Sequence, residues 1–318
     1  MKLICCGESL VDFVSVAKEG GDGLFTPVAG GGPYNSAIAA ARLGIATWLL
    51  GSAGNDWLGQ MLRDTLEKSG VNDDFFGLSP NTTPISLAKE ENGVVEYVFH
   101  GVGPKTPILE PSLIPSELPT DTTFFLFGTL ATAIDPIAGA IEKLAERQKK
   151  FSINYYDVNI RPSIISNRES FFSRFERLCS CAHIVKISDD DASWLYPEIN
   201  HEDVAKNILN KGAHLVLLTM GEKGAVAMGK NGVSPVVSPQ RIGVVDTVGA
   251  GDAFNAAFIS SLSSSGIIDH KGLREITESQ LAQALAFAVA AGAMSCTRRG
   301  ANPPTISELN DFISSHNH

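Results

Sequence analysis

The run Asp246-Thr247-Val248-Gly249-Ala250-Gly251-Asp252 contains the residue types that a phosphoryl-transfer site requires. Its small residues, 249–251, leave backbone N–H groups uncovered, and the apolar segment 253–262 behind them predicts a helix. The N-terminus of a helix can bind an anion, because its first N–H groups lack partners and the helix dipole is positive there. Asp252 lies at the same point and could accept the proton of an attacking hydroxyl. The structural alternative is an aspartate that caps an ordinary helix after a glycine-rich turn.

This run resembles the C-terminal signature of the ribokinase-like (PfkB) family of sugar and nucleoside kinases, with both aspartates and both glycines in place. The resemblance implies that Asp252 is the catalytic base. It also implies that Gly249, Ala250 and Gly251 form an anion hole, with ATP as the phosphoryl donor and Mg²⁺ beside its phosphates. The chain has neither the Walker A pattern nor the glycine-rich loop of protein kinases, so phosphate binding would depend on this turn.

Two motifs near the N-terminus predict a sugar site. The string Gly30-Gly31-Gly32-Pro33-Tyr34-Asn35 precedes a helical pattern, and its glycines let backbone approach a ligand closely. In Gly7-Glu8-Ser9-Leu10-Val11-Asp12-Phe13, the carboxylate of Asp12 can accept two sugar hydroxyls at once. The two strings resemble GGxPxN and GExLxDF of fructokinase-like members, which assigns sugar contacts to Gly31, Asn35 and Asp12. A capped turn and a solvated loop aspartate are the alternatives.

A third motif, Asp157-Val158-Asn159-Ile160-Arg161, follows an apolar strand pattern. Alternation along an extended backbone sends Asp157, Asn159 and Arg161 to one side. The motif resembles the DxNxR pattern of fructokinases and 2-keto-3-deoxygluconate kinases. That resemblance implies that Arg161 lies near the transferred phosphate and the other two residues near the substrate. Ordinary solvation of a strand end is the alternative.

His100 affects the choice of sugar. Val98-Phe99-His100 stands where the same branch often has an arginine at the end of a Phe-Tyr-Arg run. A histidine is shorter and need not be charged, so contact with a carboxylate substrate would be weakened. We therefore expect phosphorylation of a primary hydroxyl of fructose or a related ketose. Kinases for 2-keto-3-deoxygluconate, ribose, inositol or nucleosides are alternatives within the family, and a catalytically silent sugar sensor is the alternative of another class.

The nucleotide side is predicted from segments that follow later strand patterns. Lys186-Ile187-Ser188-Asp189-Asp190-Asp191 opens a helix, where acidic residues are favourable for electrostatic reasons alone. The family carries an NxxE pattern here, so the resemblance places Ser188 and Asp191 at the matching positions, with Asp191 reaching Mg²⁺ through water. Residues 219–224 resemble the TxGxxG segment of the family. The residues expected to contact the nucleotide are therefore Lys186, Ser188, Thr219, Gly221, Gly224 and Thr247. The resemblance implies that 244–245 and 291–292 form walls of the adenine pocket.

Asp246 and the late segment 297–301 resemble a monovalent-cation site that many relatives place beside the anion hole. A K⁺ ion there would orient the turn without touching the substrate. Asp246 offers the one clear side-chain ligand in the sequence. The absence of such an ion is the equal alternative.

Short apolar runs alternate with helical patterns along the chain, which is the rhythm of βαβ units. The predicted strands are 3–6, 47–50, 124–127, 151–156, 183–187 and 215–219, and the predicted helices are 35–43, 57–68, 136–149 and 281–294. This pattern predicts an α/β fold with a doubly wound, mostly parallel central sheet flanked by helices. The resemblance makes that fold ribokinase-like. Ligands are expected beyond the carboxyl ends of the strands.

Two segments interrupt this rhythm. Residues 84–89 and 94–100 flank Asn92-Gly93, a dipeptide favoured in tight hairpins, and with 13–28 they predict a small β-sheet. The resemblance makes this sheet a lid over the sugar. A second hairpin dipeptide, Asn231-Gly232, predicts an antiparallel edge of the main sheet from 225–228 and 233–237.

The predicted domains follow from these elements. We expect an α/β nucleotide- and substrate-binding core of residues 1–12, 31–82 and 108–318, and a lid of residues 13–30 and 83–107. The lid would have open strand edges, which invite pairing with another chain. We therefore expect a homodimer that forms through the lid.

The composition excludes several other classes of protein. The chain has 318 residues and a net charge of −10, with no basic stripe for a polyphosphate backbone, so no nucleic-acid partner is expected. Its five cysteines form no CxxC pair or disulfide-like spacing, which favours thiols in a reducing cytoplasm. The N-terminus reads as a strand and no apolar run reaches about 18 residues, so neither export nor a membrane partner is expected.

Overall fold

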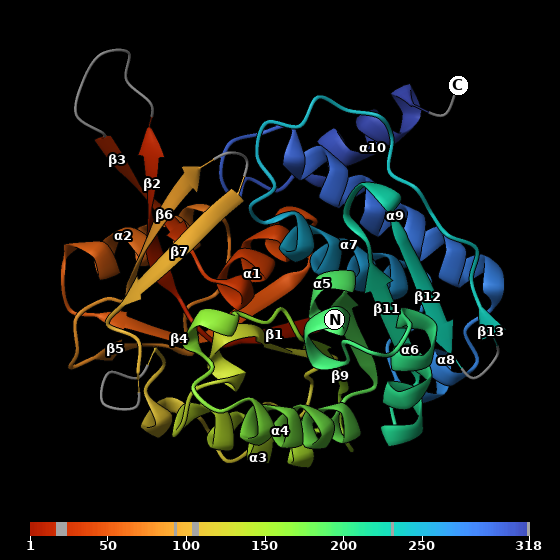
Figure 1. Cartoon of the computed structure of the whole chain (residues 1–318), viewed down its shortest axis with the longest axis horizontal. Helices are drawn as coiled ribbons and strands as arrows, with labels where there is room; N and C mark the ends of the chain where they lie inside the picture. Colours follow the sequence, from red (N-terminus) through yellow and green to blue (C-terminus); the bar gives the residue numbers. More distant parts are fainter. Residues whose placement is uncertain (17–23, 92–93, 104–107, 230–231, 317–318) are drawn as a thin grey trace.

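Two β-sheets organise the part of the chain that the computed structural model describes, which is residues 1–16, 24–91, 94–103, 108–229 and 232–316 (Figure 1). The strands of the larger sheet are β1 (Lys2–Cys6), β4 (Ala46–Gly54), β5 (Phe76–Ser79), β8 (Phe124–Gly128), β9 (Ile153–Asp157), β10 (Ile184–Ser188), β11 (Leu215–Thr219), β12 (Ala225–Gly229) and β13 (Gly232–Val233). They lie in the order β13-β12-β11-β10-β9-β8-β1-β4-β5. Neighbours pair in parallel, except that β12 is antiparallel to both β11 and β13.

Helices cover both faces of this sheet. The first face carries α1 (Gly32–Arg42), α2 (Trp57–Lys68), α7 (Ala250–Ser264), α9 (Glu278–Cys296) and α10 (Ile306–Ser315). The second face carries α3 (Ile137–Gln148), α4 (Arg168–Cys181), α5 (Asp189–Leu195) and α6 (His201–Lys211). Shorter helical pieces are α8 (His270–Arg274), η1 (Pro111–Leu113), η2 (Thr129–Thr132), η3 (Pro162–Ile164) and η4 (Gly221–Lys223). The predicted doubly wound α/β fold is confirmed.

Strand β1 illustrates why both faces must be covered. Leu3 and Cys5 belong to the hydrophobic core on one face, Ile4 and Cys6 belong to the core on the other, and none of the four is exposed. Parallel strands buried on both sides are apolar at nearly every position. Burying each large apolar side chain stabilises the fold by about 1.5–3 kcal/mol. The two cores together fix the sheet and therefore the loops at its strand ends.

One edge of the larger sheet is shorter than predicted. Only Gly232–Val233 pairs as β13 where the sequence indicated a strand over 233–237. Pro235 lies within that segment and has no N–H to donate to a ladder, so regular pairing stops there. Val237 then makes an isolated bridge to Ala225. The residues before Gly232 in the predicted hairpin turn lie outside the described residues.

Helix α9, which is long and rich in alanine, is the helix that the sequence predicted over 281–294. It begins at Glu278, three residues earlier than expected, because Thr277 and Gln280 form a capping box at its start. Among the described residues, α9 alone is long and apolar enough to cross a membrane by length and composition. Half of that stretch is buried inside the protein and the helix packs along α7, so a place in the core accounts for its composition.

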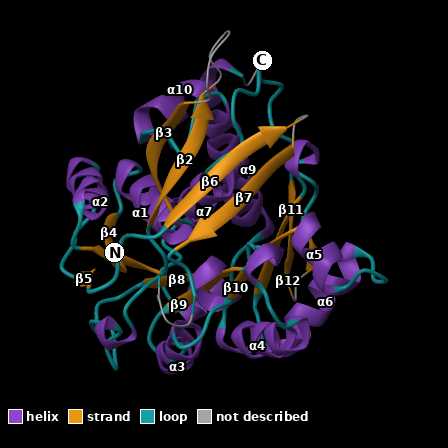
Figure 2. Ribbon diagram, turned by 60° about the vertical axis from the view of Figure 1, so that its left-hand side comes forward, coloured by secondary structure: helices purple, strands orange, loops and turns teal. Residues whose placement is uncertain are grey.

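The smaller sheet contains β2 (Leu10–Val16), β3 (Leu24–Gly30), β6 (Ile85–Glu91) and β7 (Val94–His100), in the order β3-β2-β6-β7. Two antiparallel ribbons meet through parallel pairing of β2 with β6 (Figure 2). The predicted ribbon of β6 and β7 is therefore present, although its turn at Asn92-Gly93 and residues 17–23 lie outside the described residues. β2 begins at Leu10, before the predicted lid boundary at residue 13.

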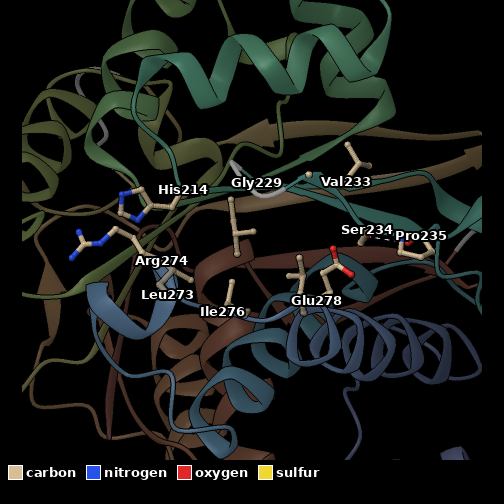
Figure 3. Close-up of a pocket in the computed structure, with 12 residues that line it drawn as sticks. His214, Gly229, Val233, Ser234, Pro235, Leu273, Arg274, Ile276 and Glu278 are labelled. Atoms are coloured by element: carbon tan, nitrogen blue, oxygen red, sulfur yellow. Dashed lines mark hydrogen bonds between the residues drawn. The ribbon is translucent and has the colours of Figure 1, made fainter.

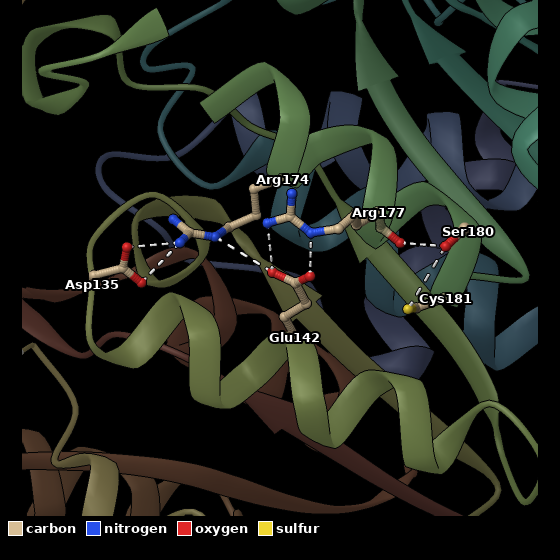
Figure 4. Close-up of polar contacts among 6 residues, drawn as sticks. All are labelled: Asp135, Glu142, Arg174, Arg177, Ser180 and Cys181. Atoms are coloured by element: carbon tan, nitrogen blue, oxygen red, sulfur yellow. Dashed lines mark hydrogen bonds and ion pairs between the residues drawn. The ribbon is translucent and has the colours of Figure 1, made fainter. Parts of the chain in front are cut away.

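Ion pairs hold α3 and α4 side by side on the second face (Figure 4). Arg174 of α4 binds Asp135, which precedes α3, with 2.7 Å between Nη2 and Oδ2. Arg177 of α4 binds Glu142 of α3. Asp135 and Arg177 are more than half exposed, so each pair contributes on the order of 0–1 kcal/mol. These contacts orient two covering helices without taking part in the site described next.

Candidate active site

Neighbouring parallel strands of the larger sheet bring polar residues to one edge. The residues at or just beyond the carboxyl ends of β1, β8, β9, β10 and β11 are Glu8, Thr129, Asp157, Ser188 and Thr219. Doubly wound sheets bind their ligands at this edge. The start of α7 reaches the same place, because a Cβ added to Gly251 would lie 2.9 Å from Nζ of Lys186 on β10, which also contacts Asp157 at the end of β9. The predicted phosphate turn and the strand ends therefore form one site.

The turn before α7 presents unpaired backbone N–H groups. Gly249 is the N-cap of α7 and has a φ of +79°, a left-handed conformation that glycine adopts without strain. Ala250 N–H makes a long bond of 3.3 Å to the Thr247 carbonyl. Within the described ranges, no acceptor is found for the N–H groups of Gly251 or Asp252. Two unpaired donors at the positive end of a helix form an anion site.

Asp252 is buried in the first turn of α7, with 7% of its surface exposed. Its Oδ2 accepts a hydrogen bond of 3.0 Å from Nδ2 of Asn35, which lies in the first turn of α1. Burial and the negative charge of Asp157 raise the pKa of Asp252 to about 7, against the opposing effects of Asn35 and Lys186. A carboxyl group with a pKa near neutrality is well matched to proton transfer at physiological pH.

A buried ion pair adjoins Asp252. Lys186 Nζ lies 3.0 Å from Asp157 Oδ1, and the two side chains are 6% and 1% exposed. Asn255 Nδ2 donates to Asp157 Oδ2 at 2.7 Å, and the Tyr155 hydroxyl donates to Asn255 Oδ1 at 2.9 Å. Although burial opposes it, the negative charge of Asp157 raises the pKa of Lys186. A charged ammonium is thereby kept close to Asp252, where it favours the ionised carboxylate.

These contacts correct the role predicted for Asp157. Both of its oxygens are engaged inside the protein and its side chain is closed to solvent, so it is not available to a sugar. Sequence reasoning missed Asn255, which lies three residues after Asp252, a spacing that places both side chains on one helix face. It also missed Tyr155, which lies two residues before Asp157 and so shares a face of β9.

Asp12 of β2 is held within the smaller sheet. Ser86, its partner on β6, donates its hydroxyl to Asp12 Oδ1. Gly30 on β3 makes room for the other oxygen, since a Cβ there would lie 2.2 Å from Oδ2. Burial raises the pKa of Asp12, against the opposing effects of Ser86 and Arg161. Ser86 belonged to no motif in the sequence, and only the pairing of β2 with β6 reveals its role.

Arg161 acts electrostatically on both predicted carboxylates, Asp12 and Asp252. Against the dominant effect of burial, its positive charge acts to lower the pKa of both Asp12 and Asp252. Its Nη1 donates to Asn159 Oδ1 at 2.6 Å and to the Ile160 carbonyl at 3.1 Å. Asn159 therefore orients the guanidinium, which is a different task from the sugar contact predicted for it.

The register of the smaller sheet separates His100 from Asp12. Asp12 pairs with Ser86, which pairs with Phe99, so these three side chains share one face. His100 is the next residue of β7 and pairs with Ile85, which places it on the opposite face, where it is exposed. The structure does not support the predicted sugar contact of His100. It places Phe99 in line with Asp12 instead.

Ser188 and Asp191 have a structural role, because they cap the N-terminus of α5. The Ser188 side chain accepts from Asp191 N–H, and Asp191 Oδ2 accepts from Ser188 N–H at 3.1 Å, which is a capping box at the start of α5. Asp191 Oδ1 accepts from Ile160 N–H at 2.8 Å. With 6% of its surface exposed and both oxygens engaged by backbone, Asp191 is closed to a metal ion. A role in Mg²⁺ binding through water has no support in this arrangement.

The other predicted nucleotide residues lie at the end of β11, in the turn that follows it, and in the turn before α7. Thr219 pairs with Ser188 in the parallel register, and both side chains are partly exposed. Gly221 is exposed on η4 with a φ of +53°, and Thr247 is exposed in the turn before α7. Gly224 has a structural reason to be glycine, since a Cβ there would lie 1.9 Å from the Val237 carbonyl oxygen.

Asp246 stabilises the turn before α7 through hydrogen bonds to backbone. Its Oδ1 accepts from Val248 N–H at 3.0 Å, and its Oδ2 accepts from Gly300 N–H at 2.8 Å. Gly249 packs against the same late segment, because a Cβ there would lie 2.8 Å from Ala301. The structure thus brings 246–249 and 297–301 together. Backbone N–H groups are the partners that it provides for this carboxylate.

Neither metal clusters nor cavity volume locates the site. Across the residues that the structure describes, no group of three or more His, Cys, Asp or Glu side chains is arranged to hold a metal ion. A cavity of about 470 Å³ lies between the β12–β13 edge and the start of α9, lined by His214, Val233, Arg274, Ile276 and Glu278 among others (Figure 3). It contains none of the predicted site residues. The converging polar groups at the strand ends identify the site instead.

Comparison with known proteins identifies the family of this chain. A sequence model of the pfkB family carbohydrate kinases matches residues 1–308. The chain belongs to this family. The kinase is 33% identical over 279 residues to a fructokinase from Rhizobium leguminosarum bv. trifolii, covering 88% of this chain and 85% of that protein. It is 29% identical over 326 residues to the probable fructokinase-5 of Arabidopsis thaliana, covering 98% and 97%.

Solved structures share the fold of the kinase. A fructokinase from Xylella fastidiosa with bound ATP has a TM-score of 0.87 at 24% identity, over 100% of this chain and 99% of that one. A fructokinase double mutant from Vibrio cholerae O395 in the fructose, ADP and potassium ion bound form has a TM-score of 0.84 at 24% identity, over 98% and 97%. The aminoimidazole riboside kinase of Salmonella enterica, complexed with aminoimidazole riboside and an ATP analog, has a TM-score of 0.83 at 25% identity, over 98% and 100%. The predicted family and activity class, a carbohydrate kinase, are confirmed.

The raised pKa of Asp252 predicts how stability depends on pH. The folded kinase keeps a proton on Asp252 up to about pH 7, whereas an unfolded chain loses it near 3.8. Between these values the folded state binds more protons, so the stability that Asp252 contributes is lost as pH rises. In urea unfolding, the stability of the wild type relative to Asp252→Asn should fall across this range, by on the order of 1.4 kcal/mol for each unit of pKa shift.

Asp311→Asn provides the control for that measurement, because Asp311 is exposed on α10. Its stability relative to the wild type should stay constant over the same pH range. A constant difference for Asp252→Asn as well would contradict a raised pKa.

Proposed function

We propose that this kinase transfers the γ-phosphoryl group of ATP to a primary hydroxyl of fructose. The observation that carries the proposal is the start of α7, where a buried carboxyl group with a pKa near 7 adjoins the unpaired N–H groups of residues 251 and 252. The sequence similarity of the chain to fructokinases of R. leguminosarum and A. thaliana supports fructose as the phosphoryl acceptor. ATP bound to the X. fastidiosa fructokinase, and fructose with ADP bound to the V. cholerae enzyme, support the two substrates.

The sugar would lie between the smaller sheet and the α/β core. Asp12, Gly31 and Asn35 would bind its hydroxyls. Asp12 has one oxygen engaged by Ser86, so Oδ2 is the oxygen that remains for a sugar hydroxyl. Asn35 donates to Asp252, so a residue that contacts the sugar would also orient the base.

The chemistry requires a base and a site for anionic charge. Asp252 would accept the proton of the attacking sugar hydroxyl. The hydroxyl oxygen would bond to the γ-phosphorus of ATP as the bond between the γ-phosphorus and the β-phosphate oxygen breaks, which releases ADP. The unpaired N–H groups of Gly251 and Asp252, at the end of the predicted anion hole 249–251, and the guanidinium of Arg161 would stabilise negative charge on the phosphoryl oxygens. Lys186 favours the ionised form of Asp252, which is the form that accepts a proton. Each group is held in place before the substrates bind.

The nucleotide would approach from the ends of β10 and β11. Thr219, Gly221 and Thr247 are exposed or partly exposed around the turn, which supports contact with ATP, and Lys186 supplies positive charge behind Gly251. Ser188 and Gly224 would shape this wall through their structural contacts.

We propose Mg²⁺ as the metal that accompanies ATP. Mg²⁺ is commonly held by substrate phosphates, waters and few protein ligands, so the lack of an acidic cluster among the described residues is compatible with it. Its chemistry would be to neutralise charge on the phosphate oxygens. One V. cholerae fructokinase structure contains a potassium ion. Since both oxygens of Asp246 accept N–H bonds here, K⁺ beside the turn would depend chiefly on backbone carbonyls.

A panel of acceptors tests the proposed substrate. ADP release should be fastest with fructose when the kinase is assayed with ATP and, in parallel, fructose, ribose, 2-keto-3-deoxygluconate, myo-inositol, adenosine and aminoimidazole riboside. Faster release with another acceptor would replace fructose and keep the kinase class. Binding of a sugar without ADP release would favour the catalytically silent sensor.

Asp252→Asn tests the proposed base. The variant keeps the size of the side chain but cannot accept the proton, so kcat should fall by about 10²–10⁴-fold while fructose affinity changes little. In the wild type, kcat should fall as pH drops below about 7, because the base becomes protonated. Asp311→Asn should retain wild-type kcat. Retention of more than about a tenth of the wild-type kcat in Asp252→Asn would remove Asp252 from this role.

We further propose a homodimer through the smaller sheet. Leu24 and Phe25 on β3 and Val98 on β7 are exposed apolar residues, at 53%, 47% and 49%, and both strands are sheet edges. Open edges with apolar side chains favour pairing with another chain. Light scattering should give twice the chain mass, and Phe25→Lys should shift it towards the monomer. Monomeric wild type at all concentrations would refute the dimer.

We also propose a reducing cytoplasm as the location. The cysteines at positions 5, 6, 179 and 181 are buried free thiols, and Cys296, the last residue of α9, is half-buried. Free buried thiols are typical of proteins kept under reducing conditions. The absence of a nucleic-acid partner remains a prediction from the charge.

A further inference from the structure

One buried acidic residue has no part in the chemistry above. Glu8 follows β1 and is 1% exposed. Its Oε1 accepts hydrogen bonds from Gly32 N–H at 3.1 Å and from the Thr129 hydroxyl, and its Oε2 accepts from Ala131 N–H at 3.2 Å. One carboxylate therefore joins the end of β1 to the first residue of α1 and to η2.

Both of these helical segments use Glu8 in place of a cap of their own. The N-cap residues of α1 and η2 are Gly31 and Gly128, and neither provides a side-chain cap. Negative charge and hydrogen-bond acceptors are favourable at helix N-termini. Glu8 supplies both to two N-termini at once, although it belongs to neither helix.

The backbone around Glu8 is also closely packed. Gly31 has a φ of +113°, and a Cβ there would lie 2.5 Å from the Glu8 carbonyl oxygen. A Cβ on Gly32 would lie 2.6 Å from Thr129 Cγ2. Thr129 itself has a φ of +56°, which is rare for a residue other than glycine. Such a conformation persists where the surroundings hold it, and the hydroxyl bond to Glu8 does so.

We propose that Glu8 is a positioning residue for the sugar site, holding the turn at Gly31–Gly32 so that Gly31 and Asn35 face the substrate. This inference rests on the proposed sugar-kinase function. Helix α1 carries the constraint, because Gly32 is its first residue and Asn35, one turn later, contacts Asp252. Losing the ionised carboxylate therefore displaces the sugar contacts and leaves the N–H groups at the start of α7 in place.

Protonation of Glu8 provides a readout that a merely structural role lacks. Burial raises the pKa of Glu8 to about 7, against the opposing effects of its three donors. A protonated carboxyl cannot accept all three bonds, so sugar affinity should weaken as pH falls below about 7. Few other groups titrate nearby. Burial raises the pKa of the Cys6 thiol on β1, which keeps it neutral, Asp12 on β2 is turned to Ser86, and neither η2 nor the first turn of α1 contains a charged residue.

Steady-state kinetics with fructose and ATP provide the first test. Glu8→Gln should raise KM for fructose by about tenfold or more, the loss expected for a charge-assisted hydrogen bond, and should leave KM for ATP within about twofold. Glu67→Gln, at an exposed position of α2, is the matched control and should change neither value. Thr129→Val should raise KM for fructose, whereas Thr129→Ser, which keeps the hydroxyl, should not.

Calorimetry of fructose binding provides the second test. In Asp252→Asn protein the titration of the base is removed, while Asp12, whose pKa is also raised by burial, still titrates. Kd should rise as pH falls through about 7, and the part of this rise that is lost in Asp252→Asn with Glu8→Gln reports on Glu8. If Glu8→Gln fails to fold, the titration of the Asp252→Asn protein and the comparison of Thr129→Val with Thr129→Ser decide the question.

The outcomes separate this inference from the proposed function. Wild-type protein that releases no ADP with any sugar overturns the kinase proposal. Active wild type with an unchanged KM for fructose in Glu8→Gln, or a Kd independent of pH in Asp252→Asn protein, overturns the role of Glu8 alone.

Discussion

Burial of the Asp252 carboxylate at the start of α7 is the constraint that links the buried polar residues around the candidate active site. A carboxylate removed from water requires hydrogen bonds or positive charge. Asn35, the helix N-terminus and Lys186 supply them. The ammonium of Lys186 is itself buried and requires Asp157, which in turn is satisfied by Asn255. A single acidic group thus accounts for a chain of polar partners inside an otherwise apolar packing.

The same constraint determines which elements must be rigid. The groups around Asp252 come from α1, β9, β10 and α7, which lie far apart in the sequence, so the two hydrophobic cores have to hold four elements in fixed relation. The smaller sheet adds Asp12 from a different layer, and Arg161 connects the two carboxylates electrostatically. Preorganised groups of this kind need no rearrangement when charge develops. Most stabilising packing in the kinase therefore lies behind the site and not in it.

The fold and the activity class were predictable because their signals are local. Continuous apolar runs mark strands buried on both faces, and residues 246–252 contain the base and its turn in one string. The role of Asp157 was not predictable, since a carboxylate at a strand end looks the same in sequence whether its partner is a sugar or Lys186. The sugar contact predicted for His100 lacks support from the structure for another reason. Its face depends on strand register, and a shift of one residue reverses every side chain of a strand.

The parallel pairing of β2 with β6 affects how the newly synthesised chain folds. Helices α1 and α2 and strands β4 and β5 all lie between these partners in the sequence. The β2–β3 ribbon therefore keeps the β2 edge unpaired until β6 has been synthesised. Contacts so distant along the chain form slowly, because a long loop has to close first. Unpaired edges promote aggregation during that interval. Refolding yield, more than equilibrium stability, is thus the property most sensitive to substitutions along that edge.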